Sequence, residues 1–361
     1  MSLTPAVISP KSQSPTENVI EIVSYDGEAT RHDLYRALSS MQGDPIENGT
    51  LIAENINPDQ DYTDDTHNPA VSNFYSLVSY AQDYEQETLA YITRVENDGG
   101  TVTDPGWVDQ QIAKLKEDQI YNDLSLFLDV RGGIKTREDG GTTYVEKWYD
   151  MSQFENDFVQ TTEASQPQLE TQGIFANGNV YMTAPSSDSL NLLEQPEDEL
   201  AHRASILIWG KINGFTQTAE QFIGKSGEDH WMFRRRANIS GIEAKWRNNG
   251  SDQHGGSNYT ETVAFDDNEW HQGWARWARG GGFDNISEVG VDNTADVIST
   301  TTTGVGMSPS AGDVTLFVQD AGGLQRYYGG QLNTIMLFSN VITESYIADH
   351  YNDNLGYYDL I

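Results

Sequence analysis

Apolar and polar residues alternate in short runs through the last two-thirds of the chain, from about Gly132 onward. Clusters of Gly, Asn, Asp and Ser separate the runs. Short, regularly punctuated runs predict antiparallel strands and favour a mainly β fold, a β-sandwich or jelly roll. The predicted strands cover residues 142–150, 174–182, 204–210, 230–234, 242–247, 259–265, 273–279, 314–319 and 333–338.

A single helix is predicted after the last strand. Thr343 can act as its N-cap, and Ile342 and Ile347 have the spacing of a hydrophobic staple.

The first third of the chain has a helical and loop-like pattern. Residues 28–42 and 71–96 carry apolar residues at spacings of three and four, which predicts two helices. A third helix is predicted from Pro105 to about Leu124, with Asp104 as its N-cap. This part is too polar to form a large core alone, so we expect it to pack on a neighbouring subunit.

The pattern divides the chain into three parts. Residues 1–27 are expected to form an extended arm, for which simple disorder is the alternative. Residues 28–130 are expected to form a helical and loop-rich attachment region, and residues 131–361 the jelly-roll domain.

Charge limits the range of partners. The chain has 55 Asp and Glu residues against 21 Lys and Arg residues, a formal net charge of −34. Because this charge repels phosphates, we expect neither nucleic acid nor membrane as a partner. Only eight of the basic residues are Lys, which favours a protein of saline habitats, where salt screens the self-repulsion. An ordinary acidic extracellular or viral protein is the alternative.

The sequence contains no Cys, which excludes disulfides, thiolate metal sites and cysteine nucleophiles. The first residues lack a basic segment followed by an apolar run, so we expect no signal peptide. No stretch approaches the roughly 18 apolar residues of a membrane span.

Catalytic patterns are weak. Glycosidases use paired carboxylates, and the nearest arrangement, Glu155 and Asp157, has no third acid in place. The seven His residues show no zinc-site spacing. We therefore expect a protein that is not an enzyme and that needs no cofactor. Calcium held by loop oxygens is the alternative, for which the candidates are Asp266, Asp267 and Asp284.

Basic and aromatic residues gather in one place. The candidate ligand-binding residues are Trp231, Arg234, Arg236, Trp246 and Arg247. Aromatic rings stack on sugar faces, and Arg side chains bind carboxylates, so this patch predicts binding of acidic glycans. The alternative is that these Arg residues pair with the protein's own Asp and Glu residues.

Several short sequence segments in the strand-rich part resemble concanavalin A-like, laminin-G-like jelly rolls. An apolar strand runs into Pro185 and then a Ser/Asp-Leu turn, as it does at the start of that fold. The other matching phrases, in the family's order, are residues 208–211, 223–225, 270–271 and 335–352.

Residues 147–152 and 161–167 are similar to a segment of phage and viral structural proteins that carry this domain. The chain departs from that pattern at Met151 and lacks the Gly-Asn that follows Ser152 there. The whole resemblance covers roughly residues 90–361.

The resemblance implies a structural protein of a tailed virus, a capsid decoration or turret, a head fibre or a tail component. Its jelly roll would face outward on the virion and bind host-surface glycans. The expected partners are other virion proteins and further copies of the chain as a homo-oligomer. The alternative is a glycan-active hydrolase or its carbohydrate-binding module.

Overall fold

A computed structural model describes most of the strands and helices of the chain. The described residues are 7–13, 18–24, 31–37, 50–53, 56, 60–66, 70, 73–80, 84–185, 187, 190, 201–212, 220–225, 231–235, 241–245, 257–259, 265, 267–280, 286–295, 312–320, 324–325 and 327–358. The chain divides into two compact units, Met1–Ala90 and Tyr91–Ile361. The division expected between residues 130 and 131 therefore lies inside the second unit.

The first unit contains two three-stranded antiparallel sheets, with strand orders β1-β2-β5 and β4-β3-β6. Its small core centres on Ile20, Leu34 and Leu77. Beside this core, Asp64 accepts hydrogen bonds from Arg36 and Tyr75. The strands are β1 (Val7–Gln13), β2 (Asn18–Ser24), β3 (Arg31–Ala37), β4 (Thr50–Ala53), β5 (Tyr62–Asp64) and β6 (Phe74–Tyr80).

The helix predicted over residues 28–42 is wrong, because Arg31–Ala37 forms β3. The helix predicted over residues 71–96 is wrong in its first part, because Phe74–Tyr80 forms β6 and helix α2 (Tyr84–Asn97) follows. Leu34 lies directly opposite Leu77 in the ladder, so pairing between strands buries the apolar residues. Short apolar runs fit both periods, and here the cross-strand contact decides.

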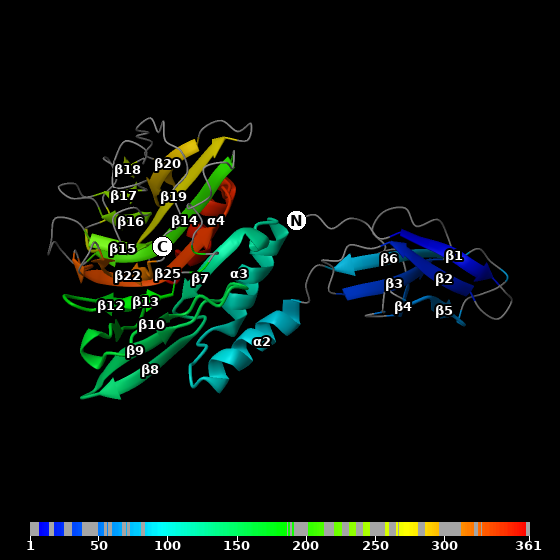
Figure 1. The fold of residues 1–361 in the computed structure, drawn as a ribbon, viewed down its shortest axis with the longest axis horizontal. Coiled ribbons are helices and arrows are strands. Elements are labelled where there is room, and N and C mark those ends of the chain that lie inside the picture. Colours follow the sequence, from blue (N-terminus) through cyan, green and yellow to red (C-terminus); the bar gives the residue numbers. More distant parts are fainter. Residues whose placement is uncertain are drawn as a thin grey trace. The chain divides into compact units, whose positions relative to one another are not determined.

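The second unit is an antiparallel β-sandwich (Figure 1), which confirms the predicted fold class. One layer has the order β7-β25-β14-β19-β20-β21, and the other runs β8-β9-β10-β13-β22-β15-β16-β17-β18. The β11–β12 pair joins β9 to β25, so the pairing is continuous along one side.

The elements described for this unit follow in chain order; helix α2 begins at Tyr84, before the boundary at Tyr91, and η1 and η2 are short 3-10 helices. They are α2 (Tyr84–Asn97), α3 (Pro105–Glu117), η1 (Tyr121–Asp123), β7 (Leu124–Asp129), β8 (Ile134–Asp139), β9 (Thr142–Trp148), β10 (Phe158–Val159), η2 (Glu163–Ser165), β11 (Gln168–Leu169), β12 (Ile174–Ala176), β13 (Met182–Ala184), β14 (Ala201–Ile212), β15 (Glu220–Lys225), β16 (Met232–Arg235), β17 (Ile242–Lys245), β18 (Ser257–Tyr259), β19 (His271–Gly280), β20 (Ile286–Val291), β21 (Thr294–Ala295), β22 (Val314–Leu316), β23 (Gln319–Asp320), β24 (Leu324–Gln325), β25 (Gly330–Phe338) and α4 (Glu344–Asn354).

The layer that contains β14 and β25 is buried on both faces. Ile206 and Ile208 of β14 point into the core between the layers. Leu207 and Trp209 point the other way and belong to a second apolar cluster with residues of α3 and α4. This alternation follows the period of two along a strand.

The predicted helix caps are confirmed. The Asp104 side chain accepts a hydrogen bond from the Trp107 N–H, and Thr343 accepts one from the Tyr346 N–H. Helix α3 ends at Glu117, earlier than the predicted Leu124, because Leu124 begins the buried strand β7. Among the described residues, no helix is both long and apolar enough to span a membrane.

Candidate functional site

Four side chains form a row across the outer face of the sandwich. Arg137 of β8 lies opposite Tyr144 of β9, and Tyr144 lies opposite Gln168 of β11. Gln168 in turn lies opposite Phe175 of β12. Residues directly opposite each other in a sheet share a face, so the four side chains are neighbours. Because Ile174, next to Phe175, points into the core, the row faces outward.

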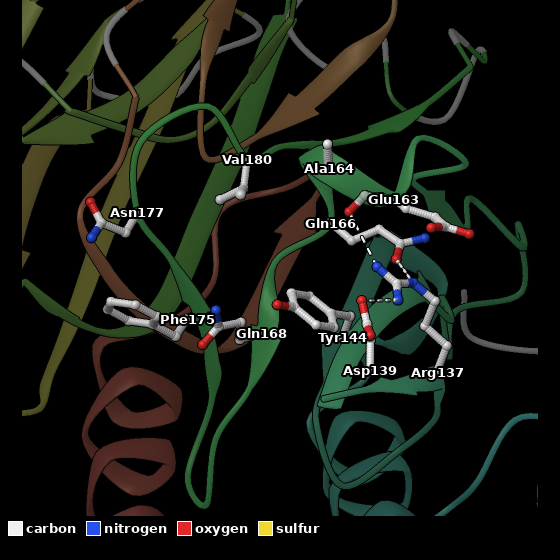
Figure 2. A pocket seen from close by; sticks show the side chains of 10 residues that line it. All are labelled: Arg137, Asp139, Tyr144, Glu163, Ala164, Gln166, Gln168, Phe175, Asn177 and Val180. Carbon is white, nitrogen blue, oxygen red and sulfur yellow. Dashed lines mark hydrogen bonds and ion pairs between the residues drawn. The ribbon is translucent and has the colours of Figure 1, made fainter. Parts of the chain in front are cut away.

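This row forms one side of a pocket of about 440 Å³. Figure 2 shows Phe175, Gln168 and Tyr144 on one side, with Val180 and Ala164 across from them. The volume lies within the range of small-molecule sites, about 300–1,000 Å³. The remaining lining residues are Asp139, Glu163, Gln166 and Asn177.

Arg137 is held by contacts with the protein itself. Its Nε donates to Gln166 Oε1 at 2.5 Å, and its Nη2 donates to the Glu163 carbonyl at 3.4 Å. Its Nη1 lies 3.5 Å from Asp139 Oδ2. The guanidinium also lies over the Tyr144 ring, 4.6 Å from its centroid. These contacts fix the orientation of the Tyr144 ring at the pocket wall.

Two amide groups face the pocket without a hydrogen-bond partner in the part of the chain that the structure describes. They belong to Gln168, which is half-buried, and Asn177, which is exposed. Gln166 differs, because its Nε2 donates to the Gln160 carbonyl. An amide both donates and accepts, so Gln168 and Asn177 can bind hydroxyl groups. The pocket thus combines two aromatic rings with polar groups suited to a hydroxylated ligand.

The structure places two of the predicted ligand-binding residues in the interior. Trp231 is 1% exposed and donates from Nε1 to the Leu190 carbonyl. Arg234 is 8% exposed and pairs with Glu243 at 2.7 Å. Neither side chain belongs to an open surface. Arg236, Trp246 and Arg247 lie outside the described residues, and binding by that part of the patch stays a prediction.

The structure describes only one of the three calcium candidates. Asp266 and Asp284 lie outside the described residues, whereas Asp267 accepts a hydrogen bond from the Nε2 side of His271 at 3.0 Å. Asp292 contacts the other ring nitrogen at 2.9 Å. Burial lowers the pKa of His271, but the two carboxylates outweigh it and raise that pKa above its ordinary value. Within the described segments, no cluster of three or more His, Asp or Glu side chains is arranged to hold a metal ion.

The acids Glu155 and Asp157 have structural contacts. Asp157 pairs with Arg94 at 2.8 Å and with Lys147 at 2.9 Å. Glu155 lies 3.8 Å from Arg94. These contacts attach the last turn of α2 to the loop after β9, so the pair does not face an open cleft as two free carboxylates.

Sequence reasoning missed every residue of the pocket. Alternation along residues 142–148 places Tyr144 on the face opposite the buried Val145, which was a usable signal. Strands β8 and β11, which supply Arg137 and Gln168, were not predicted. The row exists only through the register of four strands, which a single sequence does not specify.

Comparisons with known proteins give distant likenesses only. No protein-family model matches the sequence, and no curated protein matches it. The binding domain of Paraclostridial Mosquitocidal Protein 1 is 10% identical with a TM-score of 0.46, over 66% of this chain and 53% of that one. The botulinum neurotoxin serotype D binding domain is 13% identical with a TM-score of 0.42, over 65% and 53%.

A third solved structure is a smaller domain. It is the CBM40 of the Ruminococcus gnavus IT-sialidase bound to alpha2,3 sialyllactose, 9% identical with a TM-score of 0.35, over 41% of this chain and 82% of that one. The chain spans about half the length of the two toxin domains. Identities and TM-scores this low leave the function to be argued from the pocket itself.

Proposed function

We propose that the second unit is a glycan-binding module, with its ligand in the pocket between Tyr144 and Phe175. The observation that carries the proposal is the row of opposed residues, which places two aromatic rings on either side of the Gln168 amide. Aromatic rings pack against the C–H faces of sugars, while amides bind the hydroxyls at the ring edge. The pocket's size and its mixture of polar and apolar groups suit such a ligand.

The proposal is one of binding without catalysis. The acids of the pocket, Asp139 and Glu163, are both exposed at its rim, and Asp139 contacts Arg137. A glycosidase needs one carboxyl group in a shielded environment that raises its pKa. The exposure of these two side chains supports a binding site over an active site.

The second part of the proposal concerns the particle to which the module belongs. We infer an outward-facing component of a tailed-virus particle, with other virion proteins and copies of the chain as partners. Its support is the sequence resemblance of residues 147–152 and 161–167 to viral structural proteins. Mass spectrometry of purified particles tests it, and absence of the chain from washed virions would contradict this part alone.

Tyr144→Ala tests the binding site. We expect the dissociation constant for a bound glycan to rise at least tenfold, about 1.4 kcal/mol, because the ring contact is lost. Calorimetric titration against glycans selected from an array measures it. Phe154→Ala is the matched control, since that ring is 44% exposed and lies outside the pocket. Equal loss in both variants would refute the assignment of the pocket, and release of reducing ends would refute binding without catalysis.

A further inference from the structure

The charge arrangement of the pocket carries an inference about the class of sugar, which rests on the glycan-binding function proposed above. Arg137 is the only cation among the lining residues, all of which are described. Its three nitrogens are directed at Gln166, at the Glu163 carbonyl and at Asp139. Figure 2 shows these contacts as dashed lines between residues that line the pocket. Three of the five N–H groups of the guanidinium are therefore directed at the protein itself, and its charge is already paired with Asp139.

The remaining charges of the pocket are negative. Asp139 and Glu163 stand at the rim against the single Arg137, so the lining has an excess of one acid. The chain as a whole carries a formal charge of −34. An anionic sugar would approach against both the local and the overall charge, and no free cation in the lining would compensate.

The groups that stay available are neutral. They are the rings of Tyr144 and Phe175 and the amides of Gln168 and Asn177. Adjacent strands lie about 4.8 Å apart, so the two rings stand roughly 10 Å apart across Gln168. This spacing lets one ring contact each side of a ligand whose hydroxyls bond to the amide between them.

We propose that the pocket selects neutral, hydroxyl-rich glycans and discriminates against sugars that carry carboxylate or sulfate groups. Arg137 is a positioning residue in this site. It holds Gln166 and the Tyr144 ring in place and does not bind the ligand directly.

The test is a glycan array with equal numbers of neutral and acidic glycans, probed with the full chain at near-physiological salt. We expect the bound glycans to be neutral, with dissociation constants at least tenfold lower than those of matched carboxylated or sulfated forms. Glu163→Lys places a cation at the rim, so it should raise the ratio of acidic to neutral glycan affinity. Unchanged discrimination in this variant would overturn the charge argument.

A variant of Arg137 distinguishes a positioning role from direct binding of an anion. Arg137→Met should weaken neutral glycan binding severalfold. Because it also removes a positive charge, any change in the ratio of neutral to acidic affinity should favour neutral glycans and be no larger than the opposite change in Glu163→Lys. If the unchanged chain prefers acidic glycans and Arg137→Met abolishes that preference, Arg137 is an anion ligand and the inference fails, while glycan binding stands. If no glycan on the array binds, both the proposed function and this inference fail.

Discussion

Asp150→Asn will lower the free energy of unfolding of the second unit by about 3 kcal/mol, although the side chain touches neither the pocket nor the solvent. Asp150 is fully buried, and its carboxylate accepts hydrogen bonds from four groups of the β7 strand and the loop after β9. The donors are the backbone N–H groups of Phe127, Ser152 and Asn156 and the Ser152 hydroxyl.

The expected cost comes from the geometry of these bonds. Burial raises the pKa of Asp150 to about 6, and the hydrogen bonds oppose that shift. At pH 7.5 the group is therefore ionised and acts only as an acceptor. An Asn side chain replaces one acceptor oxygen with an NH₂ donor, which must face at least one buried N–H. Each buried donor left without an acceptor costs about 1–3 kcal/mol, and bonds to a charged acceptor lie at the upper end.

Urea denaturation at pH 7.5, followed by tryptophan fluorescence, measures this change. All eight Trp residues lie in the second unit, so the signal reports that unit. Asp109→Asn is the matched control on an exposed face of α3 and should cost under about 0.5 kcal/mol. A loss at Asp150 no larger than the control's would show that the carboxylate does not hold this corner together.

Residues 147–152 resemble a viral segment, and within them Asp150 joins the loop after β9 to β7. The sequence pattern did predict the long strands β14, β19 and β25, since a strand buried on both faces forms a short apolar run bounded by turn residues. It also predicted the caps Asp104 and Thr343, because capping depends on local residues alone.

The errors share one physical cause, which is contact between distant segments. The local pattern of residues 31–37 predicts a helix, whereas in the structure they pair with β6, which places Leu34 opposite Leu77. The sequence pattern predicts Arg234 as a surface cation, whereas in the structure it pairs with Glu243 of the neighbouring strand. The pocket row needs the register of β8, β9, β11 and β12 together, and no local pattern contains that information.

Arg131→Met should lower the free energy of unfolding by about 4 kcal/mol, because it leaves the Asp129 carboxylate buried without its cation. Arg131 is 4% exposed and Asp129 is fully buried. Two side-chain nitrogens of Arg131 donate to the two oxygens of Asp129, each at 2.8 Å. The guanidinium also lies 3.4 Å from the centroid of the Trp107 ring and donates to Asn354 of α4. One cation thus joins the sheet to both helices that cover it.

The double variant Asp129→Asn with Arg131→Met distinguishes the loss of the Arg131 contacts from the cost of an unpaired buried charge on Asp129. If the stranded carboxylate causes most of the loss, the double variant will be more stable than Arg131→Met alone, because no charge remains buried. If the contacts to Trp107 and Asn354 dominate, the double variant will be at least as unstable as the single one. Lys114→Met is the control, since it removes a partly exposed ion pair with Asp353 between the same two helices. A pair of that kind is worth about 0.2–1 kcal/mol, so a cost for Arg131→Met within this range would contradict the role of the buried charge pair.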